Sequence, residues 1–165
     1  MTLRHATLAD IPLIQALAHR IWWAHYPAII GSEQIEFMLA KIYSEPALAQ
    51  QMAEGQVFRI VETEGTEGTE FGFIAVSNHG EGRYFLHKFY LDSEKQGKGH
   101  GAEVLRLLMN EHPDLKQLRL LVNRRNYKSV NFYFKVGFMI ELCLDTHFGE
   151  GFVLDDFQMV FKKRV

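Results

Sequence analysis

The chain has 165 residues, a length that fits a single domain with a substantial hydrophobic core. Hydrophobic residues make up 47% of it and the formal net charge is −2, so the composition indicates a globular protein without a general attraction to nucleic acid or to an anionic membrane. The N-terminal segment lacks a signal-peptide pattern and no apolar run approaches membrane-spanning length, which predicts a cytoplasmic protein that does not enter a membrane.

The first third of the chain is predicted to begin with a short strand over residues 2–6 and to continue as helices. Thr7 is expected to cap the first helix, with Asp10 as its capping-box partner. That helix is expected to end in an aromatic connection over residues 22–27, and Ser32 to cap a second helix. An apolar stripe predicts the buried face of the first helix: Ile11, Ile14, Leu17, Ala18 and Ile21.

The remainder of the chain is predicted to alternate strands with two helices. Asn126 is expected to cap the last helix and Gly137 to end it. Cys143 is the only cysteine, so no internal disulfide is possible, and its apolar neighbours predict a small core residue. The predicted elements are strands at 57–62, 71–77 and 83–91, a helix at 100–111, a strand at 117–122, a helix at 127–136, and a hairpin of 138–144 and 152–162.

A glycine-rich loop lies between the strand at 83–91 and the helix that follows it. Its glycines allow backbone N–H groups to turn toward an anion, and the helix N-terminus adds partial positive charge, so a phosphate-bearing cofactor is expected. A Walker A loop is excluded because Lys98 is followed by Gly99. The dinucleotide fingerprint G-x-G-x-x-G also fits poorly. Gln96, Gly99 and Gly101 match Q/R-x-x-G-x-G/A, the pyrophosphate loop of acyl-coenzyme A binders; a glycine turn without a ligand is the alternative.

A second motif follows at residues 126–138, where the sequence NYKSVNFYFKVGF resembles the N-x-x-[AS]-x-x-F-Y-x-x-x-G-F signature of the GNAT acetyltransferase superfamily. Residues 3–11 also resemble the usual GNAT opening. The resemblance covers nearly the whole chain and implies one GNAT domain over residues 1–165. The implied fold is α/β (α+β), with a mixed central sheet of about seven strands, four or so helices, and a splay between the fourth and fifth strands.

The resemblance implies an acetyl-coenzyme A-dependent N-acetyltransferase and assigns roles to particular residues. Tyr133 matches the general acid that protonates the thiolate, although a core aromatic that shares a face with Val130 and Phe134 is the rival interpretation. His87 stands where some members place a catalytic histidine; a structural strand histidine is the alternative. Asn123 is expected to bond across the splay. The cofactor-binding residues implied are Phe89, Tyr90, Leu91, Gln96, Gly97, Lys98, Gly99, His100, Gly101, Asn126, Ser129 and Phe132.

The acceptor is expected to enter between the first helix connection and the final hairpin loop. Aromatic rings beside acids suit a cationic amine, and the chain resembles more loosely the bacterial polyamine-acetylating branch, including an acid near Asp156. A small amine or polyamine acetylated by direct attack in a ternary complex is therefore the first hypothesis. Acetylation of a protein or peptide and a catalytically silent coenzyme A-binding module are the alternatives. A homodimer is allowed, and the histidine spacing predicts no metal. The substrate-binding residues predicted are Trp22, Trp23, Tyr26 and Asp145.

Overall fold

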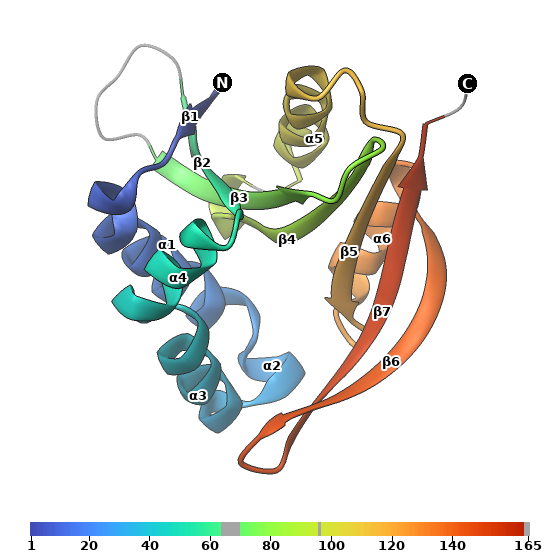
Figure 1. Cartoon of the computed structure of the whole chain (residues 1–165). Helices are drawn as coiled ribbons and strands as arrows, with labels where there is room; N and C mark the ends of the chain where they lie inside the picture. The colour runs from blue at the N-terminus through green and yellow to red at the C-terminus, as the bar shows by residue number, and fades with distance from the viewer. Residues whose placement is uncertain (64–69, 96, 164–165) are drawn as a thin grey trace. The chain divides into compact units, whose positions relative to one another are not determined.

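The computed structural model describes residues 1–63, 70–95 and 97–163 (Figure 1). In chain order its elements are β1 (Thr2–His5), the 3-10 helix η1 (Leu8–Asp10), α1 (Ile11–His25), α2 (Pro27–Ile30), α3 (Ser32–Ile42), α4 (Glu45–Ala53), β2 (Val57–Glu62), β3 (Glu70–Asn78), β4 (Arg83–Leu91), the 3-10 helix η2 (Ser93–Lys95), α5 (His100–Glu111), β5 (Gln117–Asn123), α6 (Tyr127–Lys135), β6 (Met139–Gly149) and β7 (Phe152–Lys162).

Seven strands form one mixed sheet in the order β1-β2-β3-β4-β5-β7-β6. β4 pairs with β5 in parallel, whereas β1–β2, β2–β3, β5–β7 and β6–β7 are antiparallel. This confirms the predicted α/β fold with a seven-stranded mixed sheet. The parallel pairing joins Arg83–Leu86 to Gln117–Leu120. The chain divides into two compact units: Met1–Ser77 with Lys88–Pro113 (the first unit), and Asn78–His87 with Asp114–Val165 (the second unit).

In the first unit, α1 buries the apolar stripe predicted for it and contacts α3 and α4. The helix continues to His25, so Trp22 and Trp23 lie within it, and the prediction that a connection starts at residue 22 was wrong. Pro27 explains the true end, because proline is tolerated in the first turn of α2 but not inside a helix. β2 and β3 supply much of the remaining core: Phe58, Ile60, Val61, Phe73, Ile74 and Ala75.

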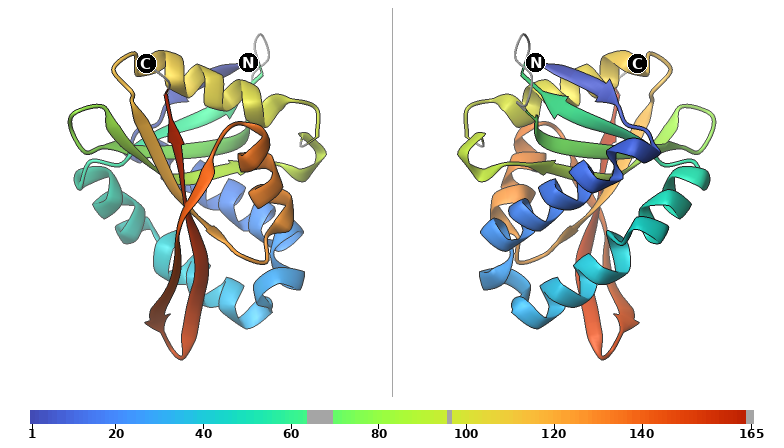
Figure 2. Two further views of the ribbon diagram at one scale, coloured as in Figure 1. Left: turned by 90° about the vertical axis from the view of Figure 1, so that its right-hand side faces the viewer. Right: turned by 90° about the vertical axis from the view of Figure 1, so that its left-hand side faces the viewer.

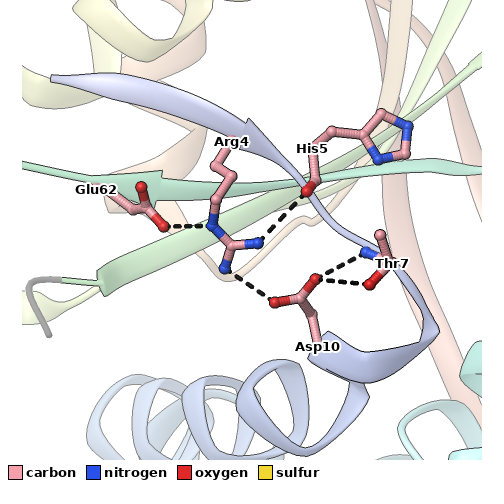
Figure 3. A network of polar contacts seen from close by, with 5 residues as sticks. All are labelled: Arg4, His5, Thr7, Asp10 and Glu62. Atoms are coloured by element: carbon pink, nitrogen blue, oxygen red, sulfur yellow. Dashed lines mark hydrogen bonds and ion pairs between the residues drawn. The ribbon is translucent and has the colours of Figure 1, made fainter. Parts of the chain in front are cut away.

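The entry into α1 is fixed by a polar network between β1, β2 and η1 (Figure 3). The Asp10 carboxylate accepts hydrogen bonds from the Thr7 backbone N–H at 2.8 Å and its hydroxyl at 3.2 Å, which confirms the predicted pairing of these residues. Arg4 donates to Asp10 at 2.9 Å and to Glu62 at 2.6 Å. The hydrogen bond from Arg4 lowers the pKa of Asp10, so the network keeps its charge in mildly acidic solution.

The start of α3 differs from the prediction by one residue. Gly31, with φ of +80°, precedes the helix as its N-cap, and Ser32 is the first helical residue, so the assignment of Ser32 as the cap was wrong. A backbone with positive φ favours glycine, which explains why the cap lies at Gly31. Ile35 and Met38, three residues apart on α3, are buried.

In the second unit, α6 packs through Val130 and Tyr133, which are buried with Phe138. The Phe138 ring lies 5.8 Å from that of Phe161 on β7. Gly137 follows the helix with φ of +94°, as predicted for a glycine that ends it. Phe134 is 46% exposed, so the expectation that it shares the buried face with Val130 and Tyr133 was wrong.

The hairpin of β6 and β7 also departs from the prediction. β6 extends to Gly149 rather than ending near residue 144, and none of its residues is buried. Cys143 is exposed as well, so its assignment as a core residue was wrong. The reason is topological. β6 is the last strand of the sheet order, and β7 is the one strand with which it pairs in the part of the chain that the structure describes. Apolar residues in an edge strand need not be buried.

Candidate functional site

The glycine loop of the first unit has the backbone that its sequence predicts. Gly97 and Gly99 adopt φ of +78° and +84°, and Gly99 is the N-cap of α5. A Cβ atom added at either glycine would meet nothing within 4 Å, so the space in front of the loop is open. The φ values, rather than crowding, are therefore what requires glycine at these positions. Gln96, predicted to contact the pyrophosphate, lies outside the described residues.

The loop is held by contacts to its flanks. The Nδ1 atom of His100 lies 2.9 Å from the Lys95 carbonyl oxygen, and the His100 ring centroid is 5.8 Å from that of Phe71. Lys95 places its Nζ 5.8 Å from the centre of the same Phe71 ring, while Lys98 is exposed. A pyrophosphate fits these groups, because the first N–H groups of a twelve-residue helix and a nearby lysine are the donors that anions require.

The end of β4 lies very close to β3 in the first unit, at a position that sequence reasoning missed. A Cβ atom on Gly72 would lie 2.4 Å from the Tyr90 carbonyl oxygen and 3.1 Å from the Leu91 Cα. Next to this contact, the Asp92 backbone N–H donates to the Phe71 carbonyl oxygen at 2.7 Å. Gly72 therefore sets the path of the Phe89–Leu91 backbone that is predicted to contact the cofactor. A glycine inside a strand was the only signal for this role.

Five aromatic side chains of the first unit form what we call the aromatic cluster: Trp22, Tyr26, Tyr43, Phe73 and Tyr90. Ring centroids lie 4.8 Å apart for Trp22–Tyr26, 5.7 Å for Trp22–Tyr43 and 5.9 Å for Trp22–Tyr90. Trp22 is buried and Tyr26 and Tyr90 are half-buried. The structure thus brings the predicted residues Trp22, Tyr26 and Tyr90 together.

Two residues near the cluster change its interpretation. Trp23 points elsewhere, with its ring centroid 6.2 Å from that of His19. Tyr43, which no sequence pattern singled out, is buried between Trp22 and Phe73, and burial raises the pKa of Tyr43 far above its ordinary value. Tyr43 is therefore a neutral hydroxyl at any physiological pH. Its place in the cluster depends on a contact between α1 and the end of α3, which sequence spacing does not show.

Lys88 of β4 is buried beside this cluster. Its Nζ donates to the carboxamide oxygens of Gln51 and Gln56, the latter at 3.2 Å. It also lies 5.8 Å from the centre of the Tyr43 ring and 5.2 Å from that of Phe58. No carboxylate among the described residues pairs with this ammonium group, and burial lowers the pKa of Lys88 to about 8.

In the second unit, α6 gathers four of the predicted residues. Asn126 is 3% exposed and caps the helix, accepting the Ser129 backbone N–H on Oδ1 at 3.2 Å. Tyr133 is 7% exposed and its ring lies 5.3 Å from Phe132 and 5.4 Å from Phe138. Tyr133 therefore belongs to the core of this unit, whatever role its hydroxyl has.

His87 and Asn123 lie on the paired strands of the second unit. The half-buried His87 ring packs 4.8 Å from Phe85 on the same face of β4. Asn123 uses both ends of its amide locally: Nδ2 donates to the Asp155 carboxylate at 2.7 Å and Oδ1 accepts the Arg125 backbone N–H at 2.9 Å. The expectation that Asn123 bonds across to β4 was wrong, because β7 lies on its other side and offers the stronger acceptor.

Acidic side chains gather where β5 ends beside β6 and β7. Asp145, predicted in a loop, lies within β6 and forms an ion pair with Arg124. Asp155 forms one with Arg125 at 3.4 Å. Asp156 has no hydrogen-bond donor among the described residues. Burial, with the neighbouring Asp155 charge as a smaller cause, raises the pKa of Asp156 to about 6.

Two further properties bear on the site. Among residues 1–63, 70–95 and 97–163, no group of three or more histidine, cysteine, aspartate or glutamate side chains is arranged to hold a metal ion. In the same part of the chain, no helix combines the length and the apolar character needed to cross a membrane.

Comparisons with known proteins agree with the fold. Residues 28–156 match the family described as acetyltransferase (GNAT) domain. No curated protein matches the chain. Among solved structures, the PaiA N-acetyltransferase of Thermoplasma acidophilum in complex with coenzyme A shares 24% identity at a TM-score of 0.77, covering 99% of this chain and 100% of that one. A chimera of the spermidine N-acetyltransferase SpeG from Vibrio cholerae and hSSAT shares 18% identity at a TM-score of 0.67, covering 98% of this chain and 94% of that one. An acetyltransferase from Thermus thermophilus shares 17% identity at a TM-score of 0.71, covering 98% of this chain and 96% of that one.

Proposed function

Because the chain belongs to the GNAT acetyltransferase family, we propose that this acetyl-coenzyme A-dependent enzyme acetylates the primary amine of a small cationic molecule, such as a polyamine. The aromatic cluster is the observation that carries this choice of acceptor. The Tyr26 and Tyr90 rings each lie within 6 Å of the Trp22 ring, centroid to centroid, and aromatic faces attract ammonium groups. The spermidine acetyltransferase among the similar structures supports the same class of acceptor.

Residues 1–165 are proposed to act as one GNAT domain that binds acetyl-coenzyme A. Acetyl-coenzyme A supplies the activated thioester. The backbone N–H groups of the glycine loop and of the start of α5 bind its pyrophosphate. A backbone N–H from Phe89–Leu91 stabilises the oxyanion, a contribution of about 3–4 kcal/mol in well-studied acyl transfers. The remaining cofactor-binding residues proposed are Gln96, Gly97, Lys98, Gly99, His100, Gly101, Asn126, Ser129 and Phe132.

Two side chains are proposed to move the protons of the transfer. His87 accepts a proton from the acceptor ammonium, directly or through water, so that a neutral amine attacks. The new bond joins the amine nitrogen to the acetyl carbon as the carbon–sulfur bond breaks. Tyr133 donates its hydroxyl proton to the departing sulfur, and the proton that the nitrogen loses as the amide forms returns to the Tyr133 oxygen. Direct attack is proposed because the sequence has one cysteine, Cys143, and no motif marks it as a nucleophile.

Release of free thiol from acetyl-coenzyme A tests the acceptor class. The panel holds polyamines, aralkylamines, amino acids and short peptides. Turnover confined to the small cationic amines supports the proposal, and among them a preference for aralkylamines would indicate that the cluster binds a ring rather than a chain. Turnover with peptides alone contradicts the proposed acceptor. Binding of acetyl-coenzyme A without thiol release from any amine contradicts the proposed reaction for this panel.

The proposed acid can be tested without disturbing the core. Tyr133→Phe keeps the ring between Phe132 and Phe138 and removes only the hydroxyl. Tyr127→Phe on the same helix is the matched control, because Tyr127 is 70% exposed. We expect kcat to fall at least about tenfold in Tyr133→Phe, with affinity for acetyl-coenzyme A unchanged. Equal losses of turnover, affinity and melting temperature would instead assign Tyr133 to the core alone.

A parallel pair tests the base. His87→Gln removes the titrating ring, and His5→Gln does the same at an exposed site on β1. Only His87→Gln should flatten the acidic limb of the profile of kcat/KM against pH. An unchanged profile would exclude His87 as the base.

A further inference from the structure

A short turn at residues 92–95 joins the two parts of the first unit that are proposed to contact the cofactor. Phe89–Leu91, at the end of β4, comes directly before this turn, and the glycines Gly97 and Gly99 follow it. Asp92 is the first residue of the turn, and η2 forms the rest of it. A displacement of the turn would therefore move the loop proposed to bind the pyrophosphate relative to the strand end proposed to bind the thioester.

Asp92 is held from three sides. Its backbone N–H donates to the Phe71 carbonyl oxygen on β3 at 2.7 Å, and its carbonyl oxygen accepts the Lys95 backbone N–H at 3.0 Å. Its carboxylate accepts two hydrogen bonds from Arg20 of α1, from Nε at 2.9 Å and from Nη2 at 2.6 Å. In the right-hand view of Figure 2, α1 runs across the strands of this unit toward the side where β4 ends, and it contacts η2. Asp92 thus connects β3, η2 and α1.

The ion pair between Arg20 and Asp92 has a geometry that arginine provides and lysine does not. Nε and Nη2 bind different oxygens of the carboxylate, which is the two-point contact of a planar guanidinium. The side chains of Arg20 and Asp92 are 57% and 21% exposed, and a pair as exposed as this contributes little to the stability of the fold. What the pair supplies is a fixed position for the turn.

The same pair offsets negative charge beside the glycine loop. The hydrogen bond to Asp92 raises the pKa of Arg20, and the charges of Asp92 and Glu94 add to this shift, so the guanidinium lies near both acids. Without Arg20, two carboxylates that closely precede the loop would repel an anionic ligand. With Arg20 in place, the partial positive charge at the start of α5 remains available to a phosphate.

We propose that Arg20 is a positioning residue for acetyl-coenzyme A, because its ion pair with Asp92 holds the pyrophosphate loop in place relative to the end of β4. The strand end itself is held by the bond from Asp92 to β3, so loss of Arg20 releases the loop and leaves the strand end in place. The proposal rests on the binding of the cofactor at the glycine loop, and it is independent of the acetyl acceptor.

Calorimetric titration with coenzyme A, which needs no acceptor, tests the proposal. In Arg20→Gln we expect Kd for coenzyme A and KM for acetyl-coenzyme A to rise at least about fivefold, with kcat at saturating cofactor within about threefold of the wild type. Arg20→Lys keeps the charge without the two-point contact and should recover only part of the affinity. Arg59→Gln is the matched control, because it breaks an ion pair of the same unit, with Glu111 at the other end of α5, and should leave Kd unchanged.

Asp92→Asn separates positioning from a simple charge effect. If Arg20 acted only as a positive charge, removal of the acid would free its guanidinium and coenzyme A would bind more tightly. If Arg20 acts through Asp92, the carboxamide oxygen accepts only one of the two hydrogen bonds and binding weakens. The double variant should then bind no more weakly than Arg20→Gln, because both substitutions remove the same interaction.

Three results would overturn the proposal: an unchanged Kd in Arg20→Gln, full recovery of affinity in Arg20→Lys, or tighter binding in Asp92→Asn. Circular dichroism shows whether each variant is folded, and if Arg20→Gln is not, Arg20→Lys and Asp92→Asn decide. Gly99→Ala distinguishes this proposal from the cofactor site on which it rests. If Gly99→Ala weakens binding and Arg20→Gln does not, only the role of Arg20 is refuted. If neither changes Kd, the assignment of the loop to the pyrophosphate fails as well.

Discussion

Replacement of the buried lysine of β4 should change how stability depends on pH. Burial lowers the pKa of Lys88 to about 8, whereas the unfolded chain titrates at the ordinary value of 10.5. Between these pH values the unfolded state binds more protons than the folded state, so the free energy of unfolding rises with pH. At neutral pH both states carry the proton, and the folded state bears the whole penalty. At 1.36 kcal/mol for each pKa unit, that penalty is up to about 3 kcal/mol.

Lys88→Met removes the charge and keeps a flexible apolar chain of similar length. The gain at pH 7 is offset in part, because the carboxamide oxygens of Gln51 and Gln56 lose a donor at about 1–3 kcal/mol for each unsatisfied group. The decisive quantity is therefore the pH dependence rather than the absolute stability. We expect the wild type to gain up to about 3 kcal/mol on the variant between about pH 8 and pH 10.5.

Urea unfolding followed by circular dichroism at several pH values measures this difference. Other titrating groups are common to both proteins and cancel. Lys128→Met, which removes the charge of an exposed lysine on α6, controls for the change in net charge. If the stability curves of wild type and Lys88→Met run parallel from pH 7 to pH 10.5, the ammonium of Lys88 is not desolvated and the reasoning fails.

Three further predictions follow from single positions. Gly99→Ala should lower the free energy of unfolding by roughly 1 kcal/mol and weaken the binding of coenzyme A measured by calorimetry. Gly80→Ala is the control, because Gly80 has a similar positive φ and equally open space: it should lower stability by a similar amount and leave binding unchanged. Gly72→Ala should lower the free energy of unfolding by about 1–3 kcal/mol and weaken coenzyme A binding, because the new Cβ would lie 2.4 Å from the Tyr90 carbonyl oxygen. An unchanged free energy of unfolding would refute this close contact. The folded pKa of Asp156, about 6, lies above its unfolded value, so wild-type stability should fall as pH rises from about 4 to 6; Asp156→Asn should lack this loss and raise KM for cationic amines.

The elements with strong local signals could be predicted from the sequence alone. The strand Arg83–Leu91 and the helix His100–Glu111 have the predicted limits, because glycines separate two clear periodicities. Asn126 caps α6 as predicted because the capping bond is local, from residue 126 to residue 129. The family was also predicted, from two motifs in the correct order.

Contacts between distant segments could not be predicted in the same way. Tyr43 meets Trp22 because the end of α3 packs on α1, and nothing in the spacing of the two residues shows that. Gly72 gave no clear signal because its role is a backbone approach to Tyr90 rather than a side-chain contact. The length of β6 and the exposure of Cys143 were missed for a related reason. Apolar residues in sequence predict burial, but the apolar residues of an edge strand need not be buried.

Each unit contains one desolvated charge that lacks an ion-pair partner among the described residues, Lys88 in the first and Asp156 in the second. Both charges lower stability at neutral pH, and a neutral side chain of similar shape would remove that cost. Groups with strongly perturbed pKa values gather at functional sites, where stability is lost in favour of chemistry. If Lys88 serves the reaction, Lys88→Met should unfold at higher urea concentration and turn over more slowly. If Lys88→Met is more stable and equally active, the charge of Lys88 serves only to hold β4 against Gln51 and Gln56. Comparing the stability and the turnover of Asp156→Asn with those of the wild type decides in the same way whether the Asp156 carboxylate binds the acceptor ammonium.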